Sequence, residues 1–373
     1  MLATRDVEKN YFIKNGWELR TCRNCGSEFY SKNEIFCNSY ECIGGYRFLE
    51  RPRPRRFFSL EDGCKQIEKY LLTECRRVQA RPIVRSDRTL FASAAGQIFD
   101  AEIYEGSNEK SDKVFCFQPV IRLQNYGGHQ NGGYSSSFVN LGIEIFNPTP
   151  HQHVESINLL LNLLSSLGLY VGHLCFKRKT YPVNDWGNIQ TSSESLKIYY
   201  GGLEIGIINY FYIPDNRSMS DISLGIERLI WAINRTTSYF DAIGPLEYVI
   251  FIKDEHLFDA VRTLSLMASA GVVPGPKNHG SKFRMVASTL SDPNTILPLE
   301  ELVQYYYLQW KFFIEPISNL TTTWYTIKNE ISRLKNRNIL ERLGMNFRDE
   351  RLNQSIYDLV RQDSSIIEKL RGC

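Results

Sequence analysis

The chain lacks a marked excess of charge of either sign. Its 373 residues include 44 lysines and arginines against 41 aspartates and glutamates, for a formal net charge of +3. Domains dedicated to nucleic-acid binding usually carry a clear basic excess, so the composition gives no evidence of such a domain. A local basic surface remains compatible with this total, because the sum does not say where the charges lie.

Long apolar segments are also missing. Residues 1–10 are charged and lack the apolar stretch of a signal peptide. No run of about 18 apolar residues occurs, so the sequence predicts no membrane-spanning helix and no membrane partner. We find no internal repeat and no low-complexity tract. We therefore expect a cytoplasmic protein, whose 43% hydrophobic residues suffice for two or three domains with buried cores.

Nine cysteines occur without an export signal, which argues against a disulfide framework. Four of them, Cys22, Cys25, Cys37 and Cys42, lie within 21 residues. Their spacing suits a tetrahedral zinc ion, with Gly26 letting the backbone turn around the first pair. The alternative is a set of ordinary buried thiols. Because four protein ligands would complete the tetrahedron, a zinc ion here would be structural rather than catalytic.

Changes along the chain predict three domains. Residues 1–56 contain the cysteine module and a basic linker, residues 57–248 are dominated by strand patterns, and residues 249–373 are mostly helical. Strands grouped with few helices favour an α+β fold over alternating βαβ units. Runs of β-branched and aromatic residues predict the strands Val114–Leu123, Ser136–Phe146, Leu169–Lys177, Leu196–Gly201 and Leu203–Pro214.

Helices are predicted where apolar residues recur at helical spacing. One begins after Ser59, because Ser59-x-x-Asp62 is a variant of the capping box. Two more cover about residues 153–167 and 224–234. In the third domain, residues 302–314 carry a dense aromatic cluster, which we expect to lie in a buried helical core.

Two arginines at the boundaries of predicted elements are candidates for binding phosphate. Arg122 ends a strand and precedes the polar, Gly-rich loop 125–133, and Arg228 follows Gly225 at the start of a helix. The planar, permanently charged guanidinium presents its donors in a fork that matches phosphate oxygens. A strand, a loop and a returning strand with an arginine at the base can fold over a nucleotide. The alternative for Arg122 is a surface position beside a long hairpin.

Several segments resemble archaeal-type alanyl-tRNA synthetases over roughly residues 10–290. Gln118-Pro-Val-Ile-Arg122 is similar to motif 2 of these class II enzymes, and Asp221-x-x-x-Gly225-Ile-Glu-Arg228 is similar to motif 3. The resemblance implies a class II aminoacyl-tRNA-synthetase-like antiparallel sheet flanked by helices, with the four-cysteine module before it and a helical domain after it. Further similar segments are Tyr11–Gly26, Thr89–Phe91, Asp185–Gly187, Gly201–Glu204, Tyr239–Ala242, Arg262–Leu264 and Gly271–Pro274.

The resemblance also implies a reaction and residues for it. A small amino acid, alanine or similar, would react with ATP to give an aminoacyl-adenylate and pyrophosphate, normally with Mg2+. As catalytic residues, Arg122 would contact the α-phosphate of ATP and Arg228 the γ-phosphate. Asp221 would pair with the ammonium group of the amino acid, and Trp186 would form a wall of its side-chain pocket. The remaining implied ATP contacts are Phe138 and Asn140.

Two departures from the family pattern fall near this site. Val139-Asn140 stands where the archaeal relatives carry Phe-Glu, and Ser193-Glu-Ser-Leu-Lys197 stands where they carry Gly-Pro-Cys-x-Glu. Lys197 therefore places a cation where the family has an anion. Asn140 and Lys197 either change the accepted substrate or abolish activity, or they are structural residues.

The resemblance is weakest in the segment that would contact tRNA, Pro274–Ser281 and the helix after it. A duplex is held by phosphate contacts from lysine and arginine, and few basic residues occur here. We therefore expect transfer to a non-tRNA acceptor, such as a carrier protein, a peptide or a small amine. One alternative is a compact alanyl-tRNA synthetase that charges tRNA. Another is a catalytically silent relative that acts as a binding or regulatory module.

Overall fold

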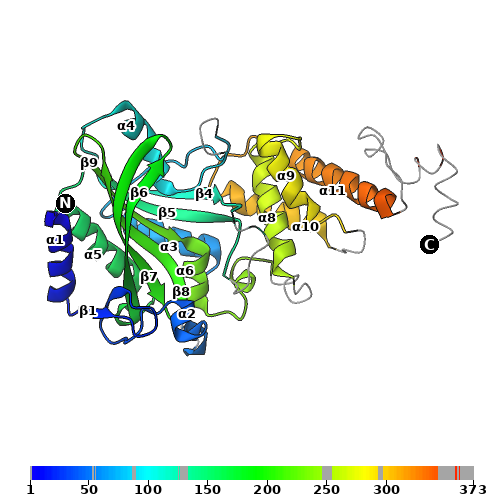
Figure 1. Ribbon diagram of the computed structural model, residues 1–373. Helices are drawn as coiled ribbons and strands as arrows, with labels where there is room; N and C mark the ends of the chain where they lie inside the picture. Colours follow the sequence, from blue (N-terminus) through cyan, green and yellow to red (C-terminus); the bar gives the residue numbers. More distant parts are fainter. Residues whose placement is uncertain are drawn as a thin grey trace.

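A single sheet forms the centre of the computed structural model, which describes residues 2–52, 54, 56–85, 90–124, 126, 133–245, 254–292, 297–342, 358 and 361. Within these residues, nine strands pair in the order β1-β2-β6-β7-β8-β9-β5-β4-β3, all antiparallel except β3 with β4 (Figure 1). The predicted α+β class is confirmed. The strands are β1 (Glu18–Thr21), β2 (Glu28–Ser31), β3 (Arg76–Arg77), β4 (Val114–Ile121), β5 (Ser137–Phe146), β6 (Leu174–Trp186), β7 (Ile189–Tyr200), β8 (Leu203–Ile213) and β9 (Arg217–Gly225).

Some of the sequence-based expectations lie outside the described residues. They include Thr89, most of the loop 125–133, the linker residues Arg53 and Arg55, and nearly all of residues 343–373. The domain boundaries stay predictions. No described helix is both long and apolar enough to cross a membrane.

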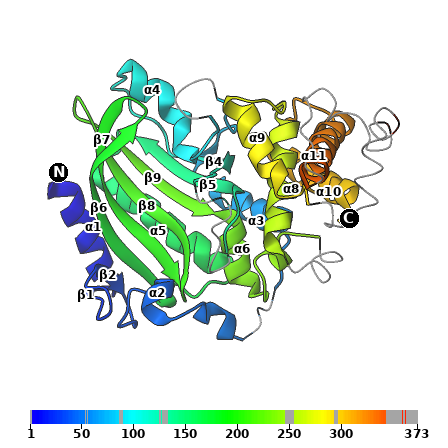
Figure 2. The same cartoon turned by 45° about the vertical axis from the view of Figure 1, so that its right-hand side comes forward.

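Helices cover one face of the sheet, and a second group of helices lies beside the end of the sheet near β4 and β5 (Figures 1 and 2). In the first group, α1 packs on α5 and α3 packs on α5 and α6. The second group is built around α8, which contacts α9, α10 and α11. The helices are α1 (Leu2–Lys14), α2 (Tyr40–Ile43), α3 (Leu60–Leu71), α4 (Asp100–Glu105), α5 (Pro150–Ser166), α6 (Ile226–Asn234), α8 (Glu255–Ser269), α9 (Asn278–Ser288), α10 (Leu299–Lys311) and α11 (Leu320–Arg342).

Alternation along β5 gives the sheet one apolar and one polar face. Val139, Leu141 and Ile143 are almost completely buried, and the backbone N–H of Val139 donates to Glu227 of α6. Successive side chains of a strand point to opposite faces, so Phe138, Asn140, Gly142 and Glu144 share the other face. On that face, Asn140 accepts a hydrogen bond from the backbone N–H of Ala95, in the 3-10 helix η2 (Ala95–Phe99).

Several elements differ from the sequence-based expectations. Strand β6 runs from Leu174 to Trp186 and β7 from Ile189 to Tyr200, where strands were predicted over Leu169–Lys177 and Leu196–Gly201. Leu224 and Gly225 are the last residues of β9, so the predicted helix begins later, at Ile226.

The strand β9 was not predicted, because its polar residues Ser220, Asp221 and Ser223 hide the strand pattern although all three are buried. Asp221 and Ser223 bind each other on one face of the sheet, whereas Ser220 binds His153 of α5 on the other face.

The N-terminal module contains a helix that its sequence did not predict. The sequence of α1 has little amphipathic character, and contacts with the rest of the protein stabilise it instead. Its Tyr11 hydroxyl donates to Asn158 of α5 at 3.0 Å, and its Phe12 ring stacks on Tyr30 at 4.5 Å. The module is also continuous with the sheet, because β2 pairs with β6.

The turn between β7 and β8 requires glycine, because the segment around Gly45 of the N-terminal module packs directly against it. A Cβ atom at Gly202 would lie 2.1 Å from the carbonyl oxygen of Gly45, and Gly202 has a φ of +98°. Side chains are excluded at such a distance and disfavoured at such a φ. The pair Gly201-Gly202 therefore lets the segment between the cysteines and the linker lie directly on the sheet.

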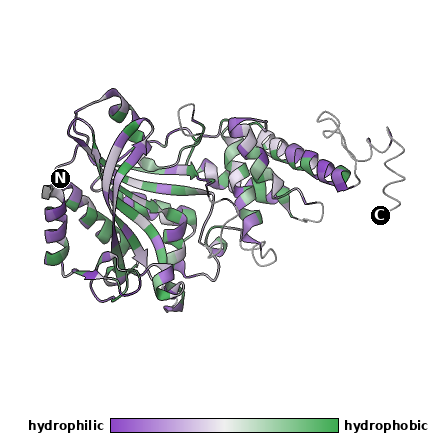
Figure 3. Cartoon of the chain, viewed as in Figure 1, coloured by the Kyte–Doolittle hydropathy of each residue, from purple (hydrophilic) through white to green (hydrophobic). Residues whose placement is uncertain are grey.

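The C-terminal helices form a second core whose centre is α8. All residues from Phe258 to Ser269 are buried, whereas Figure 3 shows that α11 is largely hydrophilic toward its C-terminal end. Tyr306 and Trp310 of α10 are fully buried, which confirms that the aromatic cluster belongs to a helical core.

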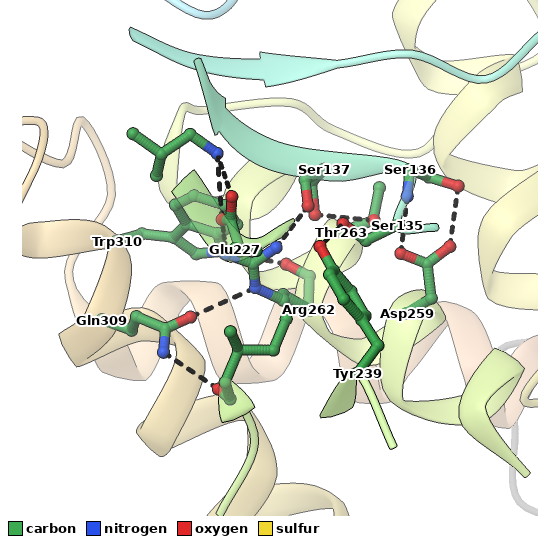
Figure 4. Close-up of polar contacts among 12 residues, drawn as sticks. Ser135, Ser136, Ser137, Glu227, Tyr239, Asp259, Arg262, Thr263, Gln309 and Trp310 are labelled. Carbon is green, nitrogen blue, oxygen red and sulfur yellow. Dashed lines mark hydrogen bonds and ion pairs between the residues drawn. The ribbon is translucent and has the colours of Figure 1, made fainter. Parts of the chain in front are cut away.

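A buried ion pair connects this helical core to the sheet (Figure 4). Arg262 of α8 donates to Glu227 of α6 at 2.6 Å, and both side chains are fully inaccessible to solvent. The Arg262 guanidinium also donates to the backbone carbonyl of Ser137 and lies 4.2 Å from the ring centroid of Trp310. Nearby, Asp259 accepts from the backbone N–H and the hydroxyl of Ser136, both at 2.7 Å.

Removing the positive partner of this pair should destabilise the fold. In Arg262→Met the Glu227 carboxylate stays buried without its cation, and we expect the free energy of unfolding to fall by about 3–5 kcal/mol. The double variant Glu227→Gln/Arg262→Met removes both charges and should recover much of that loss. Urea denaturation followed by tryptophan fluorescence measures both effects.

The matched control is Arg337→Met, which breaks an ion pair between Arg337 and Glu341 on α11. Both side chains of that pair are 53% exposed. Exposed pairs of this spacing contribute about 0.5 kcal/mol or less, so the control should unfold close to the wild type. Equal losses in Arg262→Met and Arg337→Met would contradict a special role for the buried pair.

Candidate active site

A cavity of ≈ 550 Å³ lies on the polar face of the sheet. It is bounded by the ends of β4, β5, β8 and β9 and by the first turn of α6. Four of the residues expected at the active site line it: Arg122, Phe138, Asn140 and Arg228. The structure therefore brings together side chains that are more than a hundred residues apart in the sequence.

Arg122 follows the last residue of β4 and reaches over the cavity. Its Nε and Nη2 atoms donate to the carbonyl oxygen of Ser93 at 2.8 and 2.5 Å. Its guanidinium carbon lies 5.1 Å from the ring centroid of Phe138. These contacts fix the plane of the guanidinium, and neither hydrogen bond uses Nη1.

Arg228 occupies the first turn of α6 on the other side of the cavity. Its Nε donates to the carbonyl oxygen of Gly133 at 2.8 Å, and its Nη1 donates to that of Glu204 at 3.1 Å. The guanidinium carbon lies 4.6 Å from the ring centroid of Tyr134. Like Arg122, this side chain is held by neutral carbonyl groups and by one aromatic ring.

The two arginines create a positive potential that no carboxylate of the described residues neutralises by an ion pair. Arg122 keeps part of its surface accessible to solvent, but desolvation by the surrounding atoms lowers its pKa, and repulsion from Arg228 lowers it further. An arginine stays charged at every physiological pH, so the lowered pKa measures an unfavourable interaction rather than a loss of charge. A bound anion would relieve that interaction, which makes the cavity suited to phosphate.

The carboxylates of the cavity wall are already paired. Glu227 pairs with Arg262, as described above. Glu204 accepts from Lys197 and from the Tyr199 hydroxyl, both at 2.9 Å and both through Oε2. Lys197 is thus neutralised by a neighbouring acid and is not among the residues that line the cavity. Because neither bond uses Oε1 of Glu204, that oxygen fits one ligand of a Mg2+ ion held mainly by phosphate and water.

Phe138 and Asn140 form part of the cavity floor. The Asn140 side chain accepts from the N–H of Ala95 at 2.8 Å and donates to the carbonyl oxygen of Leu224 at 3.3 Å. Both ends of its amide therefore bind backbone groups. In this arrangement Asn140 holds η2 against β9, and Phe138 supports the guanidinium of Arg122.

Asp221 lies deeper on the same face of the sheet, on β9. It accepts from Asn209 at 2.8 Å and from Ser223 at 2.6 Å, and its side chain is largely buried. Asp221 is not among the residues lining the cavity, but Ser223 is. One hydrogen bond therefore separates the Asp221 carboxylate from the cavity wall.

Trp186 stands at the tip of the β6–β7 hairpin and does not line the cavity. Its indole N–H donates to Asp100 at 2.8 Å, and its ring meets that of Phe211 at 5.4 Å. The ring also approaches η2, because a Cβ atom at Gly96 would lie 3.3 Å from it. The expected role of Trp186 in the amino-acid pocket stays a prediction.

Glu144 is a residue of the site that sequence reasoning missed. It lies opposite Asp221 in the β5–β9 register, is fully buried, and has no hydrogen-bond partner among the described residues. Burial, and secondly the Asp221 carboxylate, raise the pKa of Glu144 well above its usual range. An acid within the apolar run Leu141–Phe146 was the available signal in the sequence.

The four predicted metal ligands come together in the N-terminal module. The sulfur atoms of Cys22, Cys25, Cys37 and Cys42 all lie within 4.8 Å of one another. Cys25 Sγ and Cys37 Sγ are 3.8 Å apart, and zinc–sulfur bonds of 2.3 Å in a tetrahedron require about 3.8 Å. Gly26 has a φ of +68° and donates its N–H to the Cys22 carbonyl, which closes the first turn.

Local hydrogen bonds lower the pKa of Cys22 and Cys25, whereas burial raises the pKa of Cys37 and raises that of Cys42 to about 12. Burial acts to raise the pKa of Cys25, but hydrogen bonds from Ser27 and neighbouring thiols lower it to about 6. The backbone N–H of Cys37 donates to Cys22 Sγ at 3.4 Å, a bond that stabilises negative charge on sulfur. These residues fit a zinc ion by number, distance and donor type.

Comparisons with known proteins agree with the resemblance seen in the sequence. The alanine–tRNA ligase of Methanocella arvoryzae is 25% identical over 321 residues, which cover 77% of this chain and 35% of that enzyme. Those of Hyperthermus butylicus and Pyrococcus furiosus are 25% and 23% identical over 65% of this chain, and 28% and 30% of their lengths are covered. The similarity to archaeal alanyl-tRNA synthetases is thereby confirmed. The chain spans about a third of the length of these relatives.

Comparisons with protein-family models and with solved structures give no further information about function. A scan against models of protein families finds no match. Two structures of pyrrolysyl-tRNA synthetase from Desulfitobacterium hafniense are similar to 52% of this chain and cover 74% of their own, with TM-scores of 0.36 and 0.37 and identities of 11% and 12%. An overlap of this extent carries no conclusion about function.

Purified protein should contain about one zinc ion per chain, because four thiolates complete a tetrahedral site. Cys22→Ser should reduce the zinc content and lower the thermal midpoint, since metal binding contributes to folding. Cys116→Ser, in a buried thiol of β4 outside the cluster, is the control and should keep its zinc. Elemental analysis by mass spectrometry measures the content, and a wild-type value far below one per chain would contradict the zinc site.

Proposed function

We propose that the chain activates a small amino acid, alanine or similar, with ATP to form an aminoacyl-adenylate. The observation that supports this proposal best is the pair Arg122 and Arg228, which face one cavity without a carboxylate partner among the described residues. Similarity to alanine–tRNA ligases supports the same reaction class, that of a ligase.

In the proposed reaction, the carboxylate of the amino acid attacks the α-phosphorus of ATP. A phosphorus–oxygen bond forms to the carboxylate, the bond to the leaving pyrophosphate breaks, and no proton transfer is needed. Arg122 would stabilise the charge that develops on the α-phosphate, and Arg228 would hold the terminal phosphate. Because these cations are fixed by carbonyl groups beforehand, they need little reorganisation during the reaction. A bound Mg2+ would neutralise further phosphate charge.

The ammonium group of the amino acid would bind toward Asp221. The carboxylate of Asp221 lies behind Ser223, which lines the cavity, and Glu144 lies beside it. This arrangement places acidic groups beneath a cavity whose walls carry the two arginines. An amino acid entering between them would meet the charge it needs at each end.

A non-tRNA acceptor, such as a carrier protein, a peptide or a small amine, remains our proposal for the second step. The helix α9, in the segment that resembles the tRNA-contacting part of the family, carries only Lys282 and Arg284 as basic residues. Arg284 forms an ion pair with Glu330 of α11 at 3.4 Å, so part of this charge is neutralised. Few phosphate contacts are left for a duplex on this helix.

The alternative of a catalytically silent binding module is weakened by the position of Lys197. Lys197, one of the two residues that raised this alternative, pairs with Glu204 and does not line the cavity. Asn140, the other, lines the cavity and binds backbone groups. The alternative of a compact synthetase that charges tRNA is favoured by a different observation, a second cavity at the far end of α6 that is lined by Arg47, Arg51, Arg56 and Arg235.

Loss of Arg122 should abolish most of the activation step. We expect Arg122→Ala to reduce amino-acid-dependent ATP–pyrophosphate exchange by about 10²–10³, the usual effect of removing one preorganised donor to a developing charge. The exchange assay, run with a panel of small amino acids, also identifies the substrate. Arg337→Ala, on the exposed surface of α11, is the control and should exchange like the wild type. Normal exchange in Arg122→Ala would contradict the proposed role.

The acceptor can be identified after the activation step. If the acceptor is not tRNA, treatment of the mixture with ribonuclease should leave transfer of the radiolabelled amino acid to its acceptor unchanged. Periodate-oxidised tRNA, which lacks the terminal diol, should likewise have no effect. Transfer that requires intact tRNA would contradict the non-tRNA acceptor and favour a compact synthetase.

A further inference from the structure

A second cavity of ≈ 860 Å³ lies between the linker after the cysteine module and the C-terminal ends of α5 and α6. Among the described residues that line it, Arg47, Arg51, Arg56 and Arg235 are basic and Glu50 is acidic. We refer to these residues and the space between them as the basic hollow. Four arginines against a single glutamate leave three positive charges, as many as the formal net charge of the whole chain. The balanced total therefore conceals a strong local field.

These arginines are not used to pair acids of the described chain. None of the four forms an ion pair with a described residue, and two lie over aromatic rings instead. The Arg51 guanidinium is 4.7 Å from the ring centroid of Tyr200, and that of Arg56 is 4.6 Å from that of Phe58. A guanidinium stacked on a ring keeps its edge available for anions.

Arg235 adds an independent observation. It ends α6 in a left-handed conformation, with a φ of 56°, at a position where glycine or asparagine is less costly. Its Nη1 donates to the carbonyl oxygen of Pro52, but its Nε is buried and has no partner among the described residues. Buried donors normally have an acceptor, so this group indicates a ligand atom that the described residues do not supply. A cation near the end of a helix is favourable in itself, but that does not require a buried Nε.

We propose that the basic hollow binds a single-stranded segment of RNA. Phosphate oxygens would accept from the guanidinium groups, and a base would stack on the ring of Tyr170, which lines the basic hollow and is 62% accessible. An acidic protein would match the charge, but it would have less use for an exposed ring beside arginines. The proposal is independent of the activation reaction and does not require that the bound RNA be the acceptor.

The test is a titration with a fluorescein-labelled, single-stranded RNA of about 16 nucleotides, at the upper end of site sizes for single-strand-binding folds. Fluorescence anisotropy gives Kd at several salt concentrations. Each lost phosphate contact should lower the slope of log Kd against log salt by about 0.7. The double variant Arg47→Gln/Arg235→Asn should therefore lower the slope by about 1.4 and weaken binding at least about tenfold at low salt.

The variants are chosen so that the fold is preserved. Asparagine adopts the left-handed conformation at position 235 more readily than arginine, so the helix end should not be weakened. Arg47 is exposed, and the single variant Arg47→Gln should give half of the change in slope if the double variant folds poorly. The control Lys9→Gln/Lys110→Gln removes two exposed charges outside the basic hollow and should keep the wild-type slope.

Three results would overturn the proposal. They are a wild-type protein without salt-dependent RNA binding, equal slopes in the double variant and its control, and tight binding of poly-glutamate in place of RNA. The last result would assign the basic hollow to an acidic protein. Amino-acid-dependent ATP–pyrophosphate exchange by the wild type, measured without RNA, separates the two ideas: exchange without RNA binding contradicts only the RNA site, and RNA binding without exchange contradicts only the activation reaction.

Discussion

The buried pair between Glu227 and Arg262 is the contact on which the geometry of the candidate active site depends. Glu227 precedes Arg228 in α6 and accepts the backbone N–H of Val139 in β5, while Arg262 donates to Ser137 at the start of that strand. One pair thus fixes the helix that carries Arg228, the strand that forms the cavity floor, and the C-terminal helices. Because both groups are excluded from water, separating them would leave two unsolvated charges, so the three elements keep one arrangement.

Positive and negative side chains of the candidate site lie in different places, and only the acids on the cavity wall are paired with cations. The acids on the cavity wall are engaged by cations of the same chain, Glu227 by Arg262 and Glu204 by Lys197. Arg122, in contrast, is held by a carbonyl oxygen and keeps its full charge toward the cavity. The remaining acids, Glu144 and Asp221, lie deeper on the sheet and face each other across β5 and β9. The cavity has arginines at its walls and carboxyl groups below its floor. It is therefore suited to bind a polyphosphate and an ammonium group at the same time.

The sequence was most informative where structure depends on neighbouring residues. The capping of α3 by Ser59, the alternation along β5 and the spacing of the cysteines are local signals, and the structure confirms each. It was least informative where distant parts of the chain supply the stabilising contact. Helix α1 depends on α5, and the polar residues of β9 bind His153 of α5 and Asn209 of β8. Lys197 shows the same limit. The sequence shows that a positive charge stands at this position, but it does not show that Glu204 of the next strand neutralises that charge. The two residues meet because the register between β7 and β8 shifts at a bulge, which no local pattern reveals.

Helix α6 relates the two cavities of the molecule. Arg228 lies in its first turn and lines the candidate active-site cavity, whereas Arg235 ends it and lines the basic hollow. At a rise of 1.5 Å per residue, nine helical residues span roughly 14 Å, so the two sites are neighbours on one rigid element. The core packing of Ile226, Leu229 and Ile230 and the bond from Asn234 to the backbone of Phe58 fix both ends of that element. A strand of RNA held at one end would therefore lie at a fixed and short distance from an adenylate held at the other, without any movement of the helix between them.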